Sequence, residues 1–282
     1  MAARKTVLIT GCSDGGIGSA LATAFHQNDF HVFATARDPS KMRDLEGLPN
    51  VTFLTLDVLK PDHIKAAVEA VAKHTGGKGT LDYLVSNAGR NHFMPILDED
   101  LNTVRSLFET NFFGPIALTQ AFAPLVREAK GMVVYIASTS GYLNIPYMGT
   151  YAASKRSIEI VADTLRLELA PFGVGVLEVV TGAVKSRGQT YFGDFKLPEQ
   201  SLYKSIEPTI AARAQGNDGV PRMDTAEYAK SVVDDALKRT TGRVWYGGFA
   251  DQVKMGTTAV GVPQSAMDAG AVMGTGLDAI GG

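Results

Sequence analysis

The chain has 282 residues, of which 45% are hydrophobic and 20% are charged, and its formal net charge at pH 7 is -2. This composition is typical of a soluble globular protein, and without a basic excess we expect no nucleic acid as a partner. The single cysteine, Cys12, excludes a disulfide framework within the chain and favours a reducing compartment, so we expect a cytoplasmic protein.

Short apolar runs alternate with segments of helical period along most of the chain. The predicted strands are 7–10, 31–35, 51–56, 81–86, 132–138 and 174–180. The predicted helices are 20–27, 64–74, a long segment from 101 to about 127, 151–172 and 226–239. Each buried strand then needs a crossover helix to return to the same edge of the sheet. The pattern predicts an α/β fold with a Rossmann-type, doubly wound parallel sheet.

The alternation breaks after the sixth predicted strand. Residues 181–222 contain glycines, prolines and many polar groups, and we expect them to form a substrate lid. We predict one catalytic domain over 1–253 and a Gly/Ala-rich tail over 254–282. Glycines and Pro263 argue against a transmembrane span there; the tail is predicted to be packed or partly disordered, with peripheral membrane contact as the alternative.

A glycine-rich loop follows the first strand and leads directly into a helix. Glycines allow the backbone to turn sharply and to approach a pyrophosphate, whose charge the N–H groups and the positive end of the next helix stabilise. The context favours a dinucleotide site over a plain glycine-rich turn. The residues expected to bind are Gly11, Ser13, Gly16, Ile17 and Gly18.

Arg37 stands at the end of the second strand, where an acidic residue would select NAD. A guanidinium there can contact a 2′-phosphate, so we expect NADP(H) as the cofactor. The alternative is a solvated surface arginine paired with Asp38.

Five further residues lie at the carboxyl edge of the sheet, where ligands of open α/β folds bind. They follow the third and fourth strands and are predicted to contact the cofactor: Asp57, Val58, Asn87, Ala88 and Gly89. A cap for Asp57 and a structural turn role for Asn87 are the alternatives.

Several motifs stand in one order along the chain: Thr10-Gly11, Asn87-Ala88-Gly89, Ser138, and Tyr151 four residues before Lys155. In this order, over roughly residues 5–249, the chain resembles the short-chain dehydrogenase/reductase family. The longer glycine loop and Arg37 look like the branch that contains 17β-hydroxysteroid dehydrogenase type 1 and the fungal 1-acyldihydroxyacetone-phosphate reductases. The resemblance implies a catalytic set of Asn111, Ser138, Tyr151 and Lys155, and a homo-oligomer formed through the two long helices. The alternative is that the apolar faces of these helices pack within one subunit.

The spacing of Tyr151 and Lys155 supports the same chemistry, because residues four apart share one face of a helix. A buried cation there is expected to lower the pKa of the phenol from about 10 toward about 7, so that Tyr151 acts as general acid in reduction or base in oxidation. Ser138 would then hydrogen-bond the substrate oxygen, and Lys155 would hold the nicotinamide ribose. The resemblance implies that Asn111 binds a water of a proton relay.

The chain departs from the family pattern at three places. Asp14 is part of a glycine loop one residue longer than the commonest form, so its carboxylate must point away from the phosphates or cap a turn. Ser86 replaces a frequent asparagine before Asn87, and residues 181–186 replace a Pro-Gly motif and its threonine. Val184 and Ser186 are still expected to hold the carboxamide of the cofactor.

These residues predict an NADPH-dependent oxidoreductase that reduces a ketone of a hydrophobic small molecule, such as a lipid, a steroid-like compound or a polyketide-derived compound. The alternatives are a non-redox isomerisation, dehydration or cyclisation in the same fold, and a nucleotide-binding protein without catalysis. Five aromatic residues suggest a hydrophobic pocket, with ordinary packing as their alternative role: Tyr142, Tyr147, Tyr191, Phe192 and Phe195. The five histidines show no metal-binding spacing, so no metal is expected; His92 is predicted to be a pocket wall.

Overall fold

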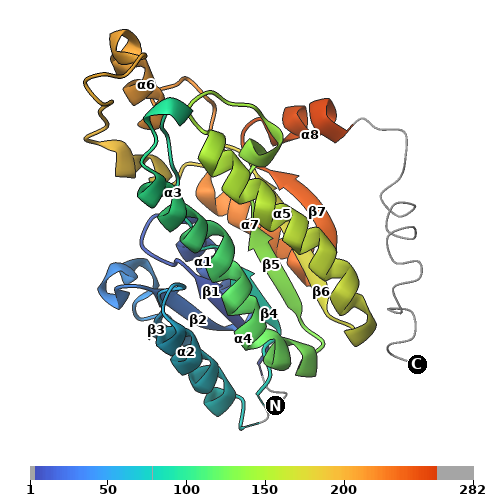
Figure 1. Cartoon of the computed structure of the whole chain (residues 1–282). Coiled ribbons are helices and arrows are strands. Elements are labelled where there is room, and N and C mark those ends of the chain that lie inside the picture. The colour runs from blue at the N-terminus through green and yellow to red at the C-terminus, as the bar shows by residue number, and fades with distance from the viewer. Residues whose placement is uncertain (1–3, 78, 259–282) are drawn as a thin grey trace.

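A computed structural model describes residues 4–77 and 79–258 of the chain. A seven-stranded parallel sheet with the order β3-β2-β1-β4-β5-β6-β7 forms its centre (Figure 1). The strands are β1 (Thr6–Thr10), β2 (His31–Ala36), β3 (Val51–Thr55), β4 (Tyr83–Ser86), β5 (Met132–Ile136), β6 (Gly175–Thr181) and β7 (Gly242–Tyr246). The order reverses between β1 and β4, and ligands of such sheets bind beyond the carboxyl ends of the strands at this point.

Helices cover both faces of the sheet (Figure 1). The helices of the described residues are α1 (Ile17–Gln27), α2 (Pro61–His74), α3 (Leu101–Phe108), α4 (Gly114–Glu128), α5 (Gly149–Leu169), α6 (Glu207–Ala214), α7 (Thr225–Leu237) and α8 (Ala250–Thr258). One buried cluster joins the sheet to α1 and α7, and a second joins it to α2, α4 and α5. The chain therefore forms three layers, which fits the predicted alternation.

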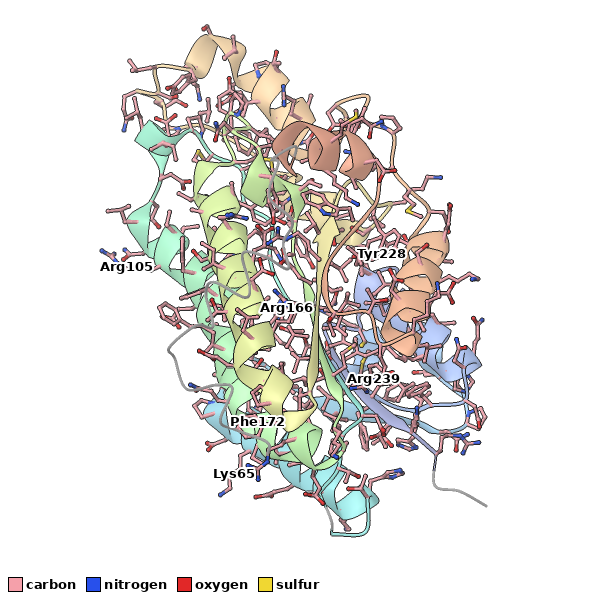
Figure 2. All side chains as sticks on the ribbon, turned by 90° about the vertical axis from the view of Figure 1, so that its right-hand side faces the viewer. Lys65, Arg105, Arg166, Phe172, Tyr228 and Arg239 are labelled. Atoms are coloured by element: carbon pink, nitrogen blue, oxygen red, sulfur yellow. The ribbon has the colours of Figure 1, made fainter. Side chains whose placement is uncertain are left out.

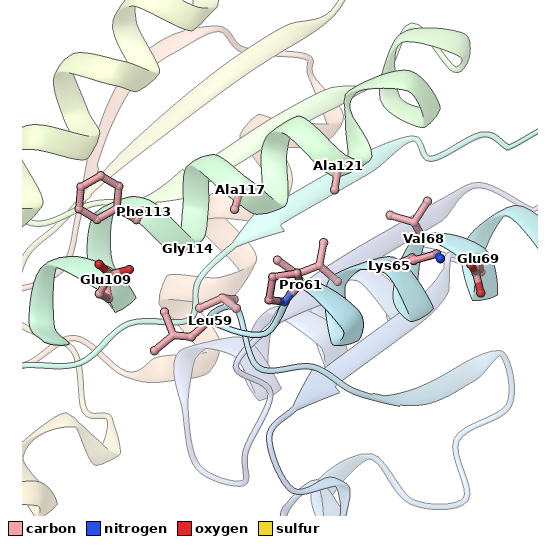
Figure 3. Close-up of a pocket in the computed structure, with 12 residues that line it drawn as sticks. Leu59, Pro61, Lys65, Val68, Glu69, Glu109, Phe113, Gly114, Ala117 and Ala121 are labelled. Carbon is pink, nitrogen blue, oxygen red and sulfur yellow. The ribbon is translucent and has the colours of Figure 1, made fainter.

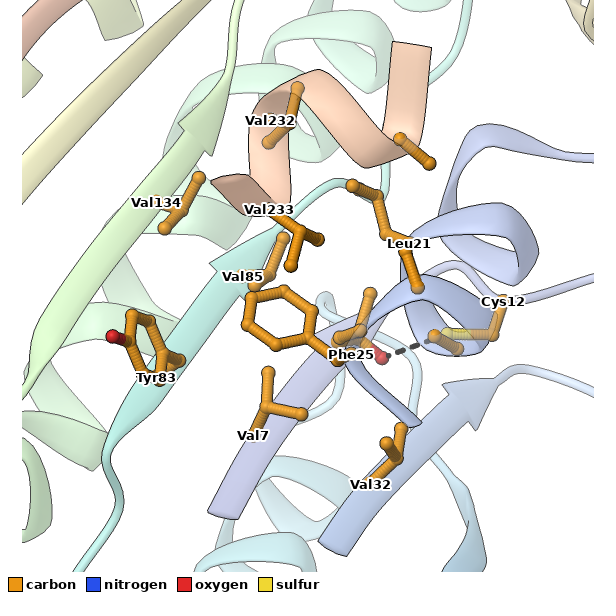
Figure 4. Close-up of a cluster of buried hydrophobic side chains, with 14 of the residues drawn as sticks. Val7, Cys12, Leu21, Phe25, Val32, Tyr83, Val85, Val134, Val232 and Val233 are labelled. Atoms are coloured by element: carbon orange, nitrogen blue, oxygen red, sulfur yellow. Dashed lines mark hydrogen bonds between the residues drawn. The ribbon is translucent and has the colours of Figure 1, made fainter. Parts of the chain in front are cut away.

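Strand β1 shows how the sequence produces this arrangement. Val7 and Ile9 belong to the cluster under α1 and α7, whereas Leu8 belongs to the opposite cluster. Successive side chains of a strand point to opposite faces, so a strand buried on both sides must be apolar throughout. Figure 4 shows Val7 beside Phe25 of α1 and Val233 of α7. Truncating such a buried phenylalanine to alanine costs about 3–5 kcal/mol.

Helix α7 is fixed at both ends by residues labelled in Figure 2. The hydroxyl of Tyr228 lies 2.6 Å from that of Thr181 at the end of β6. At the other end Arg239 donates from Nη2 to the carbonyl of Lys130, 2.9 Å away. These bonds hold α7 in a set position along the sheet.

The predicted fold class is confirmed, with differences in detail. Strand β7 was not predicted from the sequence; it is an edge strand in which only Trp245 is buried. The predicted long helix from 101 to about 127 is divided into α3 and α4 by a π-helical turn, Glu109–Phe113.

Residues 181–222 contain short 3-10 helices, Arg187–Phe192 and Lys204–Ile206, and the helix α6. Leu197 and Ile210 of this segment pack against Phe93 and Tyr147 in a small separate core. Helix α8 crosses the predicted domain boundary at 253–254, and the rest of the predicted tail lies outside the described residues. In the described part, no helix is long and apolar enough to cross a membrane.

Candidate functional site

The glycine loop connects β1 to α1 at the reversal of the strand order. Gly11 has a φ of +76°, a left-handed conformation that other residues rarely adopt. A Cβ atom on Gly18 would lie 2.4 Å from the carbonyl oxygen of Gly11 and 2.6 Å from Nδ2 of Asn87. Both positions require glycine, and together they produce a closely packed turn at the start of α1.

Two backbone N–H groups in the first turn of α1 have no protein acceptor. Gly16 precedes α1 and has no side chain to cap the helix, and in the described residues the N–H groups of Ile17 and Gly18 donate to no protein atom. Gly18 is buried, so its N–H is an orphaned buried donor, and the positive end of the helix dipole adds to it. This arrangement fits the pyrophosphate of a dinucleotide.

Asp14, the additional acidic residue, is turned toward the segment 43–44. Its carboxylate accepts from Arg43 Nε at 3.2 Å and from the backbone N–H of Asp44 at 2.9 Å. In the same place the Asp44 carboxylate accepts from the N–H of Gly15 at 2.9 Å. Asp14 therefore binds a neighbouring turn, which is one of the two outcomes expected from the sequence.

Cys12 holds the loop to the sheet. Its N–H donates to the carbonyl of Thr35 at 2.8 Å, and its thiol donates to the carbonyl of Ile9 at 3.3 Å (Figure 4). Burial raises the pKa of this fully buried thiol to about 12. The cysteine is thus a small packing residue of the loop.

Asn87 holds the end of β4 to the glycine loop. Its Nδ2 donates to the carbonyls of Thr10 at 2.8 Å and of Gly11 at 3.3 Å. The hydroxyl of Thr10 accepts from the N–H groups of Asn87 and Ala88. This is the structural role that the sequence left open for Asn87.

Arg37 is exposed at the end of β2. Asp38, its alternative partner, instead accepts from the N–H and the hydroxyl of Ser40, and it lies 3.9 Å from Lys41. Within residues 4–77 and 79–258, Arg37 forms no ion pair. Asp57, at the end of β3, accepts from the N–H of Leu59 and so also caps a turn.

The four expected catalytic residues come together from three segments. Ser138 follows β5, Tyr151 and Lys155 are on α5, and Asn111 is in the π-helical turn. Lys155 Nζ donates to the carbonyl of Ile136 at 3.0 Å, two residues before Ser138. The Ser138 side chain lies close enough to the phenol of Tyr151 to lower its pKa. A Cβ atom on Gly89 would lie 3.2 Å from Asn111 Oδ1 and 3.6 Å from Lys155 Nζ.

Asn111 is buried, and its side-chain amide is engaged on both sides. Its Oδ1 accepts from the N–H of Arg90 at 2.9 Å, and its Nδ2 donates to the carbonyl of Arg90 at 3.0 Å and to Ser154 Oγ at 3.1 Å. The amide therefore joins the segment after β4 to α5. Turns of this π type often occur at functional positions in helices.

Burial controls the protonation of the tyrosine–lysine pair. It raises the pKa of Tyr151, and the nearby Glu159 carboxylate adds to this rise, while the Ser138 side chain opposes it. Burial lowers the pKa of Lys155 to about 8, against the effect of Glu159. The pKa of Tyr151 thus shifts upward, opposite to the direction expected from the sequence, because desolvation of the phenolate dominates.

A buried charged cluster that was not predicted from the sequence lies next to Ser138. Glu159, four residues after Lys155, pairs with Arg156 at 3.2 Å. Glu178 on β6 pairs with Arg243 on β7 at 3.1 Å. Burial raises the pKa of Glu159 to about 7 and that of Glu178 to about 8. The sequence contains one signal for this cluster, which is the position of Glu159 one turn beyond Lys155 on the same helix face.

The segment after β6 is attached at several points. Val184 is buried and forms a bridge with Met223, while Gly182 donates its N–H to the carbonyl of Tyr246 at 2.8 Å. Ser186 caps the 3-10 helix Arg187–Phe192 by accepting from the N–H of Gly188. The two residues expected to hold a carboxamide thus lie in a fixed segment at the carboxyl end of β6.

The aromatic residues of the predicted pocket divide into three groups. Tyr147, Phe192 and Phe195 pack in the small core under the lid. Tyr142 stacks on Trp245, with ring centroids 4.8 Å apart, and Tyr191 is 71% exposed.

His92, the expected pocket wall, is buried and lies 2.7 Å from Glu99. The other carboxylate oxygen of Glu99 accepts from Thr150, next to Tyr151, at 2.6 Å. These bonds join the segment after β4 to the start of α5. No group of three His, Cys, Asp or Glu in the described ranges is arranged to hold a metal ion.

A groove of about 550 Å³ lies between α2 and α4 (Figure 3). It has apolar walls that include Val68, Phe113 and Ala117, and charged groups such as Lys65 and Glu109. None of the four expected catalytic residues lines it, so we do not assign the reaction to this groove.

The chain is similar to known proteins over most of its length. Residues 5–195 match the family model described as short chain dehydrogenase. Short-chain dehydrogenase PC-15 of Penicillium crustosum is 48% identical over 247 residues, which cover 88% of this chain and 90% of that protein. The NADPH-dependent 1-acyldihydroxyacetone phosphate reductase of Schizosaccharomyces pombe is 36% identical, over 97% of this chain and 91% of that protein. The crystal structure of a short-chain dehydrogenase from Streptomyces avermitilis has a TM-score of 0.76 at 29% identity and covers 96% of each chain. The chain therefore belongs to the short-chain dehydrogenase family.

Proposed function

We propose that this protein is an NADPH-dependent reductase that converts a ketone of a hydrophobic small molecule to an alcohol, with Tyr151 as the general acid. The observation that carries the proposal is the convergence of Ser138, Tyr151 and Lys155 beside a glycine loop with unpaired N–H groups. Groups that can bind phosphate and groups that can transfer a proton thus lie at the same edge of the sheet.

The glycine loop supports a dinucleotide, because the N–H groups of Ile17 and Gly18 lack protein acceptors. Arg37 supports NADPH over NADH, since Asp38 is engaged by Ser40 and leaves the guanidinium free for a phosphate. The Schizosaccharomyces pombe relative, described as NADPH-dependent, points in the same direction. Ser13, Asp57, Val58, Ala88, Gly89, Val184 and Ser186 complete the proposed binding set.

In the proposed reaction, the phenol of Tyr151 donates its proton to the carbonyl oxygen of the substrate, and Ser138 donates a hydrogen bond to the same oxygen. When bound, the reduced nicotinamide supplies the hydride. Lys155 binds the ribose by charge and hydrogen bonding, and Asn111 positions α5 through Ser154. The raised pKa of Tyr151 suits this direction, because it keeps the phenol protonated at neutral pH.

A hydrophobic substrate is supported by the lid segment, 181–222. Its Leu197 and Phe195 pack with Phe93 and Tyr147, and such apolar surfaces favour ligands with few charges. We propose that this segment covers the substrate, which would exclude water from the proton transfer.

The first test is a titration of the purified protein with NADPH and with NADH, followed by nicotinamide fluorescence. We expect NADPH to bind more tightly, and Arg37→Ala to weaken NADPH binding by about tenfold to a hundredfold, since a charge-assisted hydrogen bond contributes about 1.5–3 kcal/mol. NADH binding should not change. Failure to bind either nucleotide would overturn the proposal.

A screen of bulky ketones then tests catalysis, with Tyr151→Phe as the inactive control. Oxidation of NADPH that matches formation of an alcohol supports the reductase. Formation of product without net oxidation of NADPH would instead assign a non-redox reaction, and binding without turnover at any pH would assign a nucleotide-binding protein.

We also propose a homo-oligomer. Ile160 on α5 and Phe113 before α4 are 55% and 52% exposed, so both long helices present large apolar side chains at the surface. The cytoplasmic location expected from the single cysteine stays a prediction.

A further inference from the structure

Arg187 begins the lid segment and at the same time lies on the glycine loop. It is the first residue of the 3-10 helix Arg187–Phe192, six residues after the end of β6 at Thr181. Its Nη1 donates to the carbonyl oxygen of Asp14 at 3.1 Å, across 173 positions of sequence. One side chain thus joins the proposed lid to the proposed phosphate-binding loop.

Arg187 also lies close to the glycine loop through the carbon atoms of its side chain. A Cβ atom on Gly15 would lie 3.3 Å from Cδ of Arg187 and 3.6 Å from its Cγ. Gly15 also has a φ of +65°, which a residue with a Cβ rarely adopts. A glycine at this position, in a loop that already contains Gly16, therefore allows the arginine stem to lie against the backbone.

The guanidinium keeps donors for a further acceptor. Arginine has five N–H groups, and within the described ranges Arg187 uses one of them, on Asp14. It forms no ion pair there, and the two carboxylates beside the loop are engaged by other donors. Asp14 accepts from Arg43 and from the N–H of Asp44, and Asp44 accepts from the N–H of Gly15.

Two carboxylates lie beside the glycine loop, so binding of an anion there is favoured by two compensating positive charges. Asp14 and Asp44 bring two negative charges near the unpaired N–H groups of the α1 start, and Arg43 balances one of them. Arg187 supplies the second positive charge. An anion at the start of α1 would otherwise experience repulsion from an unbalanced carboxylate in a partly buried place.

We propose that Arg187 binds the pyrophosphate of the dinucleotide and thereby couples nucleotide binding to closure of the lid. This rests on the proposed function, because it assumes that the loop binds a dinucleotide. The planar guanidinium can contact two phosphate oxygens at once. Since Arg187 is also the first residue of the 3-10 helix, this contact stabilises the closed position of the segment that follows.

The test measures binding of NADPH and of NADH to four forms of the protein: wild type, Arg187→Gln, Arg37→Ala and Lys185→Gln. Arg187→Gln keeps an N–H donor for the Asp14 carbonyl but removes the charge. Lys185→Gln is the matched control, because it removes an exposed positive charge two residues away. Thermal unfolding without nucleotide shows whether each variant keeps the folded loop.

We expect Arg187→Gln to weaken binding of NADPH and NADH by the same factor, about tenfold to a hundredfold, because both nucleotides carry the pyrophosphate. Arg37→Ala should affect NADPH alone, and Lys185→Gln should affect neither. Unchanged binding of both nucleotides to Arg187→Gln would overturn the inference, and so would a loss confined to NADPH. If the wild type binds neither nucleotide, the proposed function fails and the inference with it.

Hydrogen exchange of a peptide covering residues 188–192 tests the coupling to the lid. Saturating NADPH should slow exchange in the wild type and in Lys185→Gln, and should leave it unchanged in Arg187→Gln. Equal protection in all three proteins would show that the lid closes without Arg187 and would overturn the coupling.

Discussion

Alanine at position 18 would place a methyl group where the glycine loop has no room. The new Cβ would lie 2.4 Å from the carbonyl oxygen of Gly11, 2.6 Å from Nδ2 of Asn87 and 2.8 Å from the carbonyl carbon of Gly11. Two of these three atoms are backbone, so no side-chain rotation can relieve the contact with Gly11. We therefore expect Gly18→Ala to displace the turn that precedes α1.

The size of the effect follows from these distances. The Gly11 carbonyl must retreat by about 1 Å to reach ordinary van der Waals contact, and overpacking of this kind costs about 1–3 kcal/mol. Displacement of Asn87 also weakens its 2.8 Å bond to the carbonyl of Thr10, which adds about 1 kcal/mol. A loss of about 2–4 kcal/mol in the free energy of unfolding lowers the midpoint of thermal unfolding by about 5–15 °C in a domain of this size.

Calorimetry and NADPH titration measure the two consequences in parallel. Gly193→Ala is the matched control, because a Cβ there meets no atom within 4 Å and its backbone is helical, with a φ of -56°. The control should unfold at the same temperature or slightly above and bind NADPH normally. If Gly18→Ala keeps both the unfolding midpoint and the affinity of the wild type, the close packing of the glycine loop is wrong.

Three further predictions concern charge and assembly. Glu159→Gln should move the alkaline limb of the rate of ketone reduction to lower pH, because the carboxylate raises the pKa of Tyr151; an unchanged profile of kcat/KM against pH would contradict this. Burial raises the pKa of Glu178 from 4.5 in the unfolded chain to about 8, so its favourable contribution to stability is complete below pH 4.5 and is lost as the pH rises through 8. The free energy of unfolding of Glu178→Gln should therefore rise relative to that of wild type as the pH increases from 5 to 8, measured by urea unfolding at these two pH values. An equal difference between the two proteins at pH 5 and at pH 8 would refute the reasoning. Wild type should sediment as an oligomer at micromolar concentration and Ile160→Glu should shift it toward monomer, whereas a monomeric wild type would end that proposal.

The sheet could be predicted because six strands are mostly apolar runs between helical segments, and the central ones are buried on both faces, which favours apolar residues throughout. Strand β7 was missed because it begins with Gly242 and Arg243, so that its apolar run is only three residues long; Arg243 pairs with Glu178 on the neighbouring strand. The π-helical turn was not predicted because one additional residue in a helix leaves the apolar period on each side nearly intact.

At the site, motif order predicted which residues come together, since local sequence fixes Tyr151 and Lys155 on one helix face. It did not predict the direction of the pKa shift of Tyr151, because that shift depends on burial and on Glu159, which only the folded chain brings into effect. The engagement of Asn87 and Asn111 with backbone groups likewise depends on tertiary contacts.

The single thiol of the chain has a practical consequence. Cys12 is buried inside the glycine loop, bonded to the carbonyl of Ile9, and its pKa is raised to about 12, so an alkylating reagent can reach it only when the loop opens. Because the sequence contains no other cysteine, the rate of alkylation of the whole protein reports on that one event. The molecule thus carries its own probe of how often the start of α1 separates from the sheet, without any introduced label.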